Sequence, residues 1–232
     1  MICFALLIRE RSVADSSRAA RLLYFMTSDE LSELNQIDKE KTSERFGPVE
    51  ELDRRAMSFL YFRFRNPVFD LLMPFMSVIC NKGLLHMASG TFMILWGLHA
   101  RLPGLSKAGV VMMASAGSAF FVAELPIKFF WRRKRPFMVM DEILPKVPHK
   151  RLLKRPSFPS GHASGYFAGA AALTICYPAW WAVFFAVAVL GAYSRIYNGV
   201  HFPTDVIAGS LIGAIFGFVV TPLLLPLLAG AF

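Results

Sequence analysis

The sequence predicts an all-α protein, a polytopic membrane helix bundle with five to six transmembrane helices. The chain has 232 residues, of which 55% are hydrophobic and 18% are charged. Soluble domains contain about 45–50% apolar and about 25% charged residues. Residues 157–232 contain two charged side chains, Arg195 and Asp205, which is far too few for a surface in water. The apolar excess therefore indicates helices that face lipid.

The apolar residues are concentrated in segments of transmembrane length. A spanning helix needs about 20 mostly apolar residues, with a range of roughly 17–25. Tyr177-Pro178 separates two of the segments and indicates a tight turn between antiparallel helices. A sixth apolar stretch, 67–81, is interrupted by Asp70, so we expect a re-entrant or interfacial helix there, or a weak sixth span. The five predicted spans are 84–100, 108–128, 162–177, 179–195 and 205–229.

The N-terminal region differs from the rest in composition. The first 66 residues carry eleven basic and eleven acidic side chains. The stretch from Asp38 to Arg45 alternates in sign, which is typical of a solvated or membrane-surface helix. We therefore predict an N-terminal interfacial or flexible segment, 1–49, followed by a transmembrane domain, 50–232.

The net charge of +9 comes mainly from residues 128–155. A basic patch beside apolar spans suits an anionic partner such as a lipid headgroup, a phosphate or a nucleic acid. We do not expect a nucleic-acid partner, because this basic loop has no folded module around it and is flanked by spans.

Polar and ionisable residues near membrane spans are energetically expensive and are usually functional. Three such clusters stand at the end of the second span, at the start of the third, and between the fourth and fifth. In an up-and-down bundle these three places lie on one face of the membrane, so we expect the clusters to converge. They are Lys128 to Pro136, Pro159 to His162, and Ser194 to Asp205.

The residue types in these clusters suit phosphate chemistry. Lys128, Arg135 and Arg195 are cations, and a guanidinium can bind two phosphate oxygens at once. Ser160 offers a hydroxyl, and Gly161 lets a backbone N–H approach an anion closely at a helix N-terminus. These five residues are the candidate phosphate-binding groups.

Two histidines and an aspartate supply candidate catalytic groups. His201 and Asp205 are four residues apart, so one helical turn places the carboxylate beside the imidazole. An aspartate that holds one ring nitrogen leaves the other free to attack. With His162, the pair suggests one nucleophile and one general acid. No cluster has the ligand count of a catalytic metal site, so we expect the cations to neutralise the phosphate charge.

The combined pattern resembles a known family signature. Lys128-x6-Arg135-Pro136, Pro159-Ser160-Gly161-His162 and Ser194-Arg195-x5-His201-x3-Asp205 are similar to the three-part signature of the type 2 phosphatidic acid phosphatase superfamily, which also includes vanadium haloperoxidases. The resemblance covers about residues 50–229, with every signature position matched in order. It implies an integral membrane lipid phosphatase that works without a metal or other cofactor.

The resemblance also implies a role for each site residue. His201 resembles the histidine that attacks phosphorus and becomes phosphorylated, and Asp205 resembles the carboxylate that orients it. His162 resembles the acid that protonates the leaving alcohol and then activates water. The residues that resemble the phosphate cradle are Lys128, Arg135, Ser160, Gly161 and Arg195.

The expected partner is a membrane lipid with a phosphate or diphosphate, such as phosphatidic acid, phosphatidylglycerol phosphate, undecaprenyl diphosphate or lipid A. Two alternatives remain open: a lipid phosphotransferase that uses the same site, and a non-catalytic lipid-binding membrane protein. The sequence does not determine the oligomeric state. Loop 129–161 holds nine Lys or Arg residues, which by the positive-inside rule favours a cytoplasmic site. The resemblance implies a bacterial inner membrane and a periplasmic or exterior site, and we follow it.

Several charged or titratable residues outside the signature have simpler interpretations. We interpret Arg132, Arg133 and Lys134 as positive-inside anchors or as loose attractors of lipid headgroups. Glu124 lies one helical turn before Lys128, where an ion pair could orient the lysine. We expect His86 and His99 to be packing or interfacial residues. The glycines that we expect to serve helix packing, because their four-residue spacing lets helices approach closely, are Gly165, Gly169, Gly209, Gly213 and Gly217.

Overall fold

The structure of the protein is a computed structural model that describes residues 47–231, except 80–82, 148–151 and 154. The described residues from Glu51 onward belong to one compact unit, and its regular elements are helices. The predicted segment 1–49 lies almost entirely outside the described residues, so the predicted domain boundary stays a prediction.

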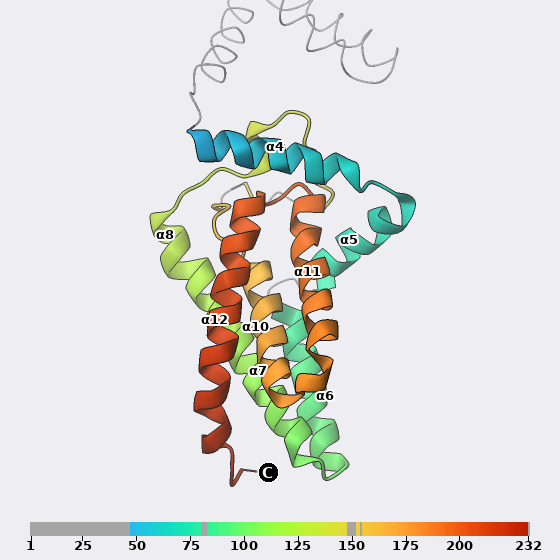
Figure 1. The fold of residues 1–232 in the computed structure, drawn as a ribbon, viewed down its shortest axis with the longest axis vertical. Helices are drawn as coiled ribbons and strands as arrows, with labels where there is room; N and C mark the ends of the chain where they lie inside the picture. The colour runs from blue at the N-terminus through green and yellow to red at the C-terminus, as the bar shows by residue number, and fades with distance from the viewer. Residues whose placement is uncertain (1–46, 80–82, 148–151, 154, 232) are drawn as a thin grey trace, which may run out of the picture. The chain divides into compact units, whose positions relative to one another are not determined.

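A bundle of five helices forms the centre of this unit (Figure 1). Four helices match a predicted span to within two residues, and α7 begins five residues before the predicted 108–128, in a helical stretch that continues to Phe130. The predicted fold class is confirmed. Within the described residues, the stretches 103–130, 178–197 and 203–227 are long and apolar enough to cross a membrane. The five helices are α6 (Leu84–His99), α7 (Pro103–Val122), α10 (Gly161–Cys176), α11 (Trp181–Tyr197) and α12 (Pro203–Leu227).

The second span ends in an irregular segment that carries site residues. A π-helical turn, η2 (Ala123–Ile127), joins α7 to the short helix α8 (Lys128–Phe130). Pro126 lies inside this turn, and it removes a backbone donor that a regular α-helix would use. Such π-bulges are frequent at functional sites. The remaining short helices are α9 (Pro136–Val139) and the 3₁₀ turn η3 (Pro178–Trp180).

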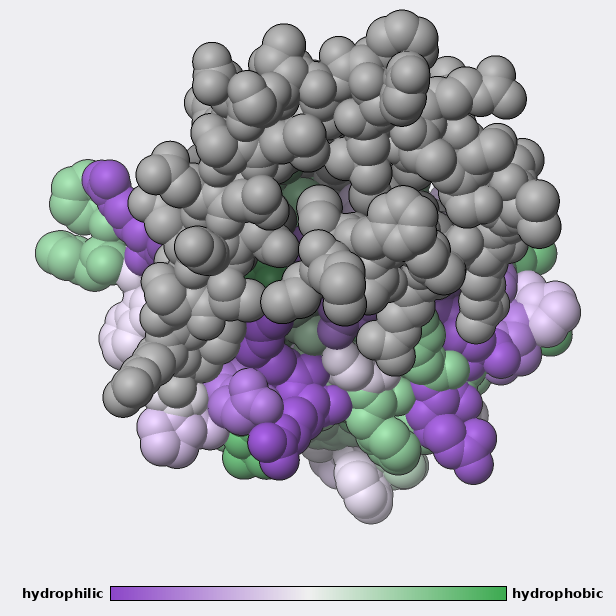
Figure 2. Space-filling model, turned by 90° about the horizontal axis from the view of Figure 1, so that it is seen from above, coloured by the Kyte–Doolittle hydropathy of each residue, from purple (hydrophilic) through white to green (hydrophobic). Residues whose placement is uncertain are grey.

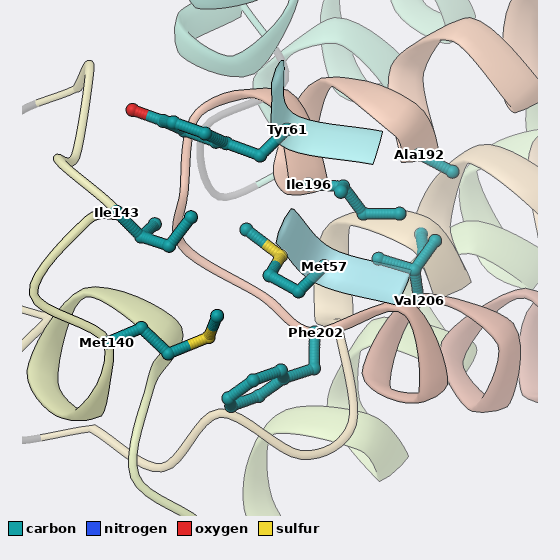
Figure 3. Close-up of a cluster of buried hydrophobic side chains, with 9 residues drawn as sticks. Met57, Tyr61, Met140, Ile143, Ala192, Ile196, Phe202 and Val206 are labelled. Atoms are coloured by element: carbon teal, nitrogen blue, oxygen red, sulfur yellow. The ribbon is translucent and has the colours of Figure 1, made fainter. Parts of the chain in front are cut away.

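Helix α4 (Pro48–Arg63) lies across one end of the bundle (Figure 1). Its Met57 and Tyr61 point into a hydrophobic cluster with side chains from α11, α12 and the loop after α9 (Figure 3). The side chain of Met57 is fully buried. Burial of one such side chain contributes about 1.5–3 kcal/mol, so this face of α4 is held firmly over the bundle end. The other members of the cluster include Met140, Ile143, Ala192, Ile196, Phe202 and Val206.

Helix α5 (Pro67–Ile79) follows α4 and packs against α11. Its 13 residues rise about 20 Å at about 1.5 Å per residue. The hydrocarbon core is roughly 30 Å thick, so the described residues of α5, which end next to the undescribed 80–82, cover about two thirds of it. This length agrees with the expected re-entrant or interfacial helix.

Helix α12 approaches α10 closely along the glycines of α12. A Cβ atom added at Gly209 would lie 2.3 Å from the Ser160 carbonyl oxygen, and one added at Gly213 would lie 2.2 Å from the Ser164 carbonyl oxygen. Both distances are far below any real contact, so the packing interpretation of this glycine ladder is confirmed. The close contact fixes the start of α10 against α12, where two of the candidate clusters lie.

The apolar flanks and the partly hydrophilic end of the bundle fit a membrane protein. Large apolar side chains are exposed along α11 and α12, including Val183, Val187, Leu211, Ile215 and Leu223. Seen from above, the visible part of the end crossed by α4 carries groups of hydrophilic residues between hydrophobic ones (Figure 2). The helix flanks therefore suit lipid tails, and this end suits polar headgroups.

Candidate active site

The three candidate clusters meet at the bundle end crossed by α4 (Figure 1). Backbone hydrogen bonds join their loops: the Ser160 N–H donates to the Asp205 carbonyl at 2.9 Å, and the Ser157 N–H donates to the Arg133 carbonyl at 2.8 Å. Both ends of the connection between the second and third spans are thereby held against the connection between the fourth and fifth, as the up-and-down topology predicted.

His201 lies at the centre of the site and is 2% exposed. Its Nε2 atom is 3.1 Å from Nη1 of Arg135. A guanidinium only donates hydrogen bonds, so Nε2 accepts and the ring proton resides on Nδ1. Nδ1 is 3.5 Å from the Ser157 hydroxyl oxygen and 3.6 Å from Oδ2 of Asp205. Nε2 is therefore the ring nitrogen that carries the lone pair.

The Asp205 carboxylate is fully buried and surrounded by donors. Its Oδ2 accepts hydrogen bonds from the Ser157 hydroxyl and, at 2.8 Å, from the Phe202 N–H. Its Oδ1 accepts one from Nη1 of Arg133 at 2.9 Å. Since 3.6 Å is too long for a hydrogen bond to His201, the Ser157 hydroxyl stands as a bridge between carboxylate and imidazole.

Several hydrogen bonds hold the guanidinium of Arg135, one of the candidate phosphate-binding residues. Its guanidinium donates to the carbonyls of Val200 at 2.8 Å, Arg155 at 3.1 Å and Pro156 at 3.1 Å. Burial lowers the pKa of Arg135 to about 10, so the group is still cationic at neutral pH. A fixed positive charge thus lies directly beside the His201 ring.

The other two cations reach the site from α8 and α11. Lys128 forms an ion pair with Glu124, which confirms the expected pair. Arg195 donates to the Ser77 hydroxyl on α5. The charges of both act on His201, so the positive charge around this ring comes from three separate segments.

The first turn of α10 completes the arrangement. Ser160 is its N-cap, with its Oγ accepting from the Ala163 N–H at 3.4 Å. A Cβ at Gly161 would lie 2.5 Å from Oε1 of Glu124, so a side chain there would displace the carboxylate that pairs with Lys128. His162 lines a cavity of about 70 Å³ and lies close enough to His201 for the two charges to interact. The site thus brings together two imidazoles, three cations and the N-terminus of α10.

Comparison with known proteins identifies the family. The profile of the PAP2 superfamily matches residues 106–226, which is slightly more than half of the chain. The chain belongs to the PAP2 superfamily. The matched segment includes all three candidate clusters.

Two solved PAP2 structures are similar in fold. One is a transmembrane PAP2-type phosphatidylglycerolphosphate phosphatase from Bacillus subtilis, with a TM-score of 0.56 and 22% identity, covering 83% of this chain and 94% of that one. The other is LpxE from Aquifex aeolicus, with a TM-score of 0.57 and 24% identity, covering 78% of this chain and 98% of that one. At this identity the likeness concerns the fold.

Curated relatives match shorter stretches. An undecaprenyl-diphosphatase of Sulfolobus acidocaldarius is 37% identical over 116 residues, which are 48% of this chain and 53% of that protein. A lipid A 1-phosphatase of Rhizobium johnstonii is 42% identical over 60 residues, which are 26% of this chain and 25% of that protein. The match therefore spans about half, or less, of each curated relative.

In this PAP2 chain, the interpretation of Arg133 as a membrane anchor was wrong. Arg133 is not a free membrane anchor: its guanidinium donates to Asp53 at 2.6 Å, to Thr204 at 2.7 Å and to Asp205 at 2.9 Å. Residues 131–135 are non-helical, and alternate residues of an extended chain share a face. Arg133 therefore lies on the same side as Arg135 and points inward.

Sequence reasoning also missed Ser157 and Asp53. Ser157 stands two residues before the second PAP2 motif, and Asp53 lies in a charged region without any motif. Two of the histidines outside the motifs, His86 and His99, agree with their interpretation as packing or interfacial residues. His86 is buried edge-on against Tyr166, and it also lines the cavity beside His162. His99 is exposed beside Trp96.

The His201 ring should resist protonation in the substrate-free PAP2 protein. Burial and the charges of Arg135, Arg195 and Lys128 hold its pKa well below the usual 6.5. The unfolded chain binds this proton more readily, so the contribution of His201 to stability is present above about pH 6.5 and falls as the pH drops below it. NMR of histidine-labelled protein in detergent should show a neutral His201 ring at about pH 6. A midpoint near 6.5 would contradict this electrostatic picture.

Proposed function

We propose that this protein is an integral membrane phosphatase that hydrolyses a phosphomonoester or diphosphate on a lipid through a phosphohistidine intermediate. The observation that carries the proposal is the position of His201. Its Nε2 faces Arg135, its Nδ1 faces Ser157 and Asp205, and cations from three segments surround it. A neutral nucleophile beside fixed positive charge suits attack on a phosphate.

In the first step, Nε2 of His201 forms a bond to phosphorus while the bond from phosphorus to the lipid oxygen breaks. His162 donates a proton to that oxygen, so the lipid leaves as an alcohol, or as a monophosphate when the substrate is a diphosphate. The positive charge that develops on the His201 ring is stabilised by Asp205 through Nδ1 and Ser157.

In the second step, His162 takes a proton from a water molecule as the water oxygen attacks the phosphohistidine. The nitrogen–phosphorus bond breaks, inorganic phosphate leaves, and both imidazoles return to their starting states. The proposed phosphate-binding groups in both steps are Lys128, Arg135, Ser160, Gly161 and Arg195. The charges of the three cations act on His201, and Ser160 and Gly161 stand at the N-terminus of α10, which favours an anion.

The location of the site favours a lipid substrate. It lies at one end of a bundle whose flanks expose large apolar side chains, so acyl or isoprenyl chains can stay in the bilayer while the headgroup meets the cations. The names of the relatives favour undecaprenyl diphosphate and lipid A among the possible substrates. We assign the site to the periplasmic or exterior face of a bacterial inner membrane, following the family resemblance.

A substrate panel with purified protein in detergent tests this function. The lipids are phosphatidic acid, phosphatidylglycerol phosphate, undecaprenyl diphosphate and lipid A, and released phosphate is measured with and without a chelator. We expect release from at least one lipid and no effect of the chelator, because the protein's own cations neutralise the phosphate. Label recovered on a second lipid or sugar would indicate a phosphotransferase instead. No turnover of any lipid would favour a non-catalytic lipid-binding protein.

A further inference from the structure

Arg133 joins three elements behind the candidate nucleophile. Its Nη1 donates to Oδ1 of Asp205 at 2.9 Å and to the Thr204 hydroxyl at 2.7 Å, both on the first turn of α12. Its Nη2 donates to Oδ2 of Asp53 on α4 at 2.6 Å. The guanidinium also stacks over the Phe202 ring at 4.1 Å. Arg133 thus holds the Oδ1 atom of Asp205, whereas Ser157 and His201 lie at Oδ2.

Asp53 on α4 binds both Arg133 and the first turn of α12. It is 2% exposed, and it accepts from the Thr204 N–H at 3.0 Å and from the Thr204 hydroxyl at 2.6 Å. A carboxylate at a helix N-terminus satisfies free N–H groups and is favoured by the helix dipole. Asp53 therefore connects α4 both to the start of α12 and to Arg133.

From this geometry, and on the basis of the proposed function, we propose that Arg133 is a positioning residue that holds the Asp205 carboxylate in place, and that helix α4 anchors Arg133 through Asp53. The hydrogen bonds of Arg133 go to Thr204, Asp205 and Asp53, so Arg133 acts on His201 through Asp205. The amphipathic helix α4 is then part of the catalytic machinery as well as a cover over the bundle end.

The charge of Arg133 has a second effect on the nucleophile. Arg133 offsets the negative charge of Asp205 and so reduces the stabilisation of an imidazolium at His201. Its loss leaves Asp205 less compensated, which raises the pKa of His201 and removes the attacking lone pair at acidic pH. The other charged or titratable groups that act on His201 are Arg135 before α9, Lys128 on α8, His162 on α10 and Arg195 on α11.

Arg133→Gln and Arg133→Lys separate charge from geometry. For Arg133→Gln we expect kcat to fall roughly 10- to 100-fold, the range for groups that orient a catalytic residue from behind, with little change in KM. Its rate relative to the unmodified protein should fall further from about pH 8 to about pH 5. The ionisation of the substrate is common to both proteins and cancels in this ratio. Arg133→Lys keeps the charge but cannot span two carboxylates, so its kcat should fall while the ratio stays flat with pH.

Two further variants complete the design. Asp53→Ala removes the anchor on α4 and should lower kcat in the same direction. Arg132→Gln is the matched control, because Arg132 is the adjacent exposed cation, and it should behave like the unmodified protein. His201→Ala is measured in the same assay, and the folding of every variant is checked by thermal unfolding in detergent.

The outcomes distinguish this inference from the proposed function. If His201→Ala is inactive and Arg133→Gln keeps both the rate and the pH profile of the unmodified protein, the positioning role is wrong and the proposed function stands. If His201→Ala is active, the proposed function itself is wrong. If Arg133→Gln does not fold, Arg133→Lys and Asp53→Ala decide: an unchanged kcat in both overturns the positioning role.

Discussion

His201→Ala should abolish phosphate release, with a fall in kcat of roughly ten-thousand-fold or more, the size of loss seen when a catalytic histidine system is disabled. The physical reason is that no other nucleophilic nitrogen faces Arg135 in the described site. The measurement is phosphate release from the best lipid of the panel. The matched control is His99→Ala, because His99 is an exposed histidine on α6, and it should retain full activity.

Trapping of the intermediate separates the roles of the two imidazoles. Rapid quenching with a labelled substrate should leave acid-labile phosphate on the unmodified protein and none on His201→Ala. His162→Ala, given a phosphate ester whose leaving group needs no proton, should form the phosphoprotein and hydrolyse it slowly. Full activity in His201→Ala with normal folding would exclude His201 as the nucleophile.

The fold could be predicted from sequence because its main signal is local. Transmembrane length, apolar composition and the positions of Pro103, Pro178 and Pro203 are properties of short segments, and the five helices follow them closely. The convergence of the three motifs was also predictable, since an alternating bundle places every second connection on the same side. The start of α11 at Trp181 differs from the prediction because Pro178–Trp180 form a 3₁₀ turn first.

The support behind the site could not be predicted in the same way. Arg133 is one of four consecutive cations, and nothing local distinguishes it from Arg132 or Lys134. Its role depends on a partner 80 residues earlier, Asp53, and on another 72 residues later, Asp205. Asp53 is one of several carboxylates in a nearly neutral region. Only the docking of α4 by Met57 and Tyr61 brings it to α12, and that is a tertiary effect.

Arg135→Lys should impair both activity and stability. The guanidinium donates to three backbone carbonyls and to His201 from a side chain that is 2% exposed. A lysine ammonium is a single nitrogen and cannot reach all four acceptors. Each buried carbonyl left without a partner costs about 1–3 kcal/mol. Loss of one preorganised donor beside the developing charge lowers kcat roughly 10²- to 10³-fold.

The two effects of Arg135→Lys are measured separately. Thermal unfolding in detergent reports stability, and its increase with added inorganic phosphate reports anion binding in the site. The control Arg132→Lys makes the same substitution at the exposed cation three positions earlier and should leave both readings unchanged. If Arg135→Lys keeps the full rate and the full stabilisation by phosphate, Arg135 does not bind the phosphate. If the variant is folded, slow and no longer stabilised by phosphate, the charge beside the nucleophile acts through the forked geometry that only a guanidinium provides.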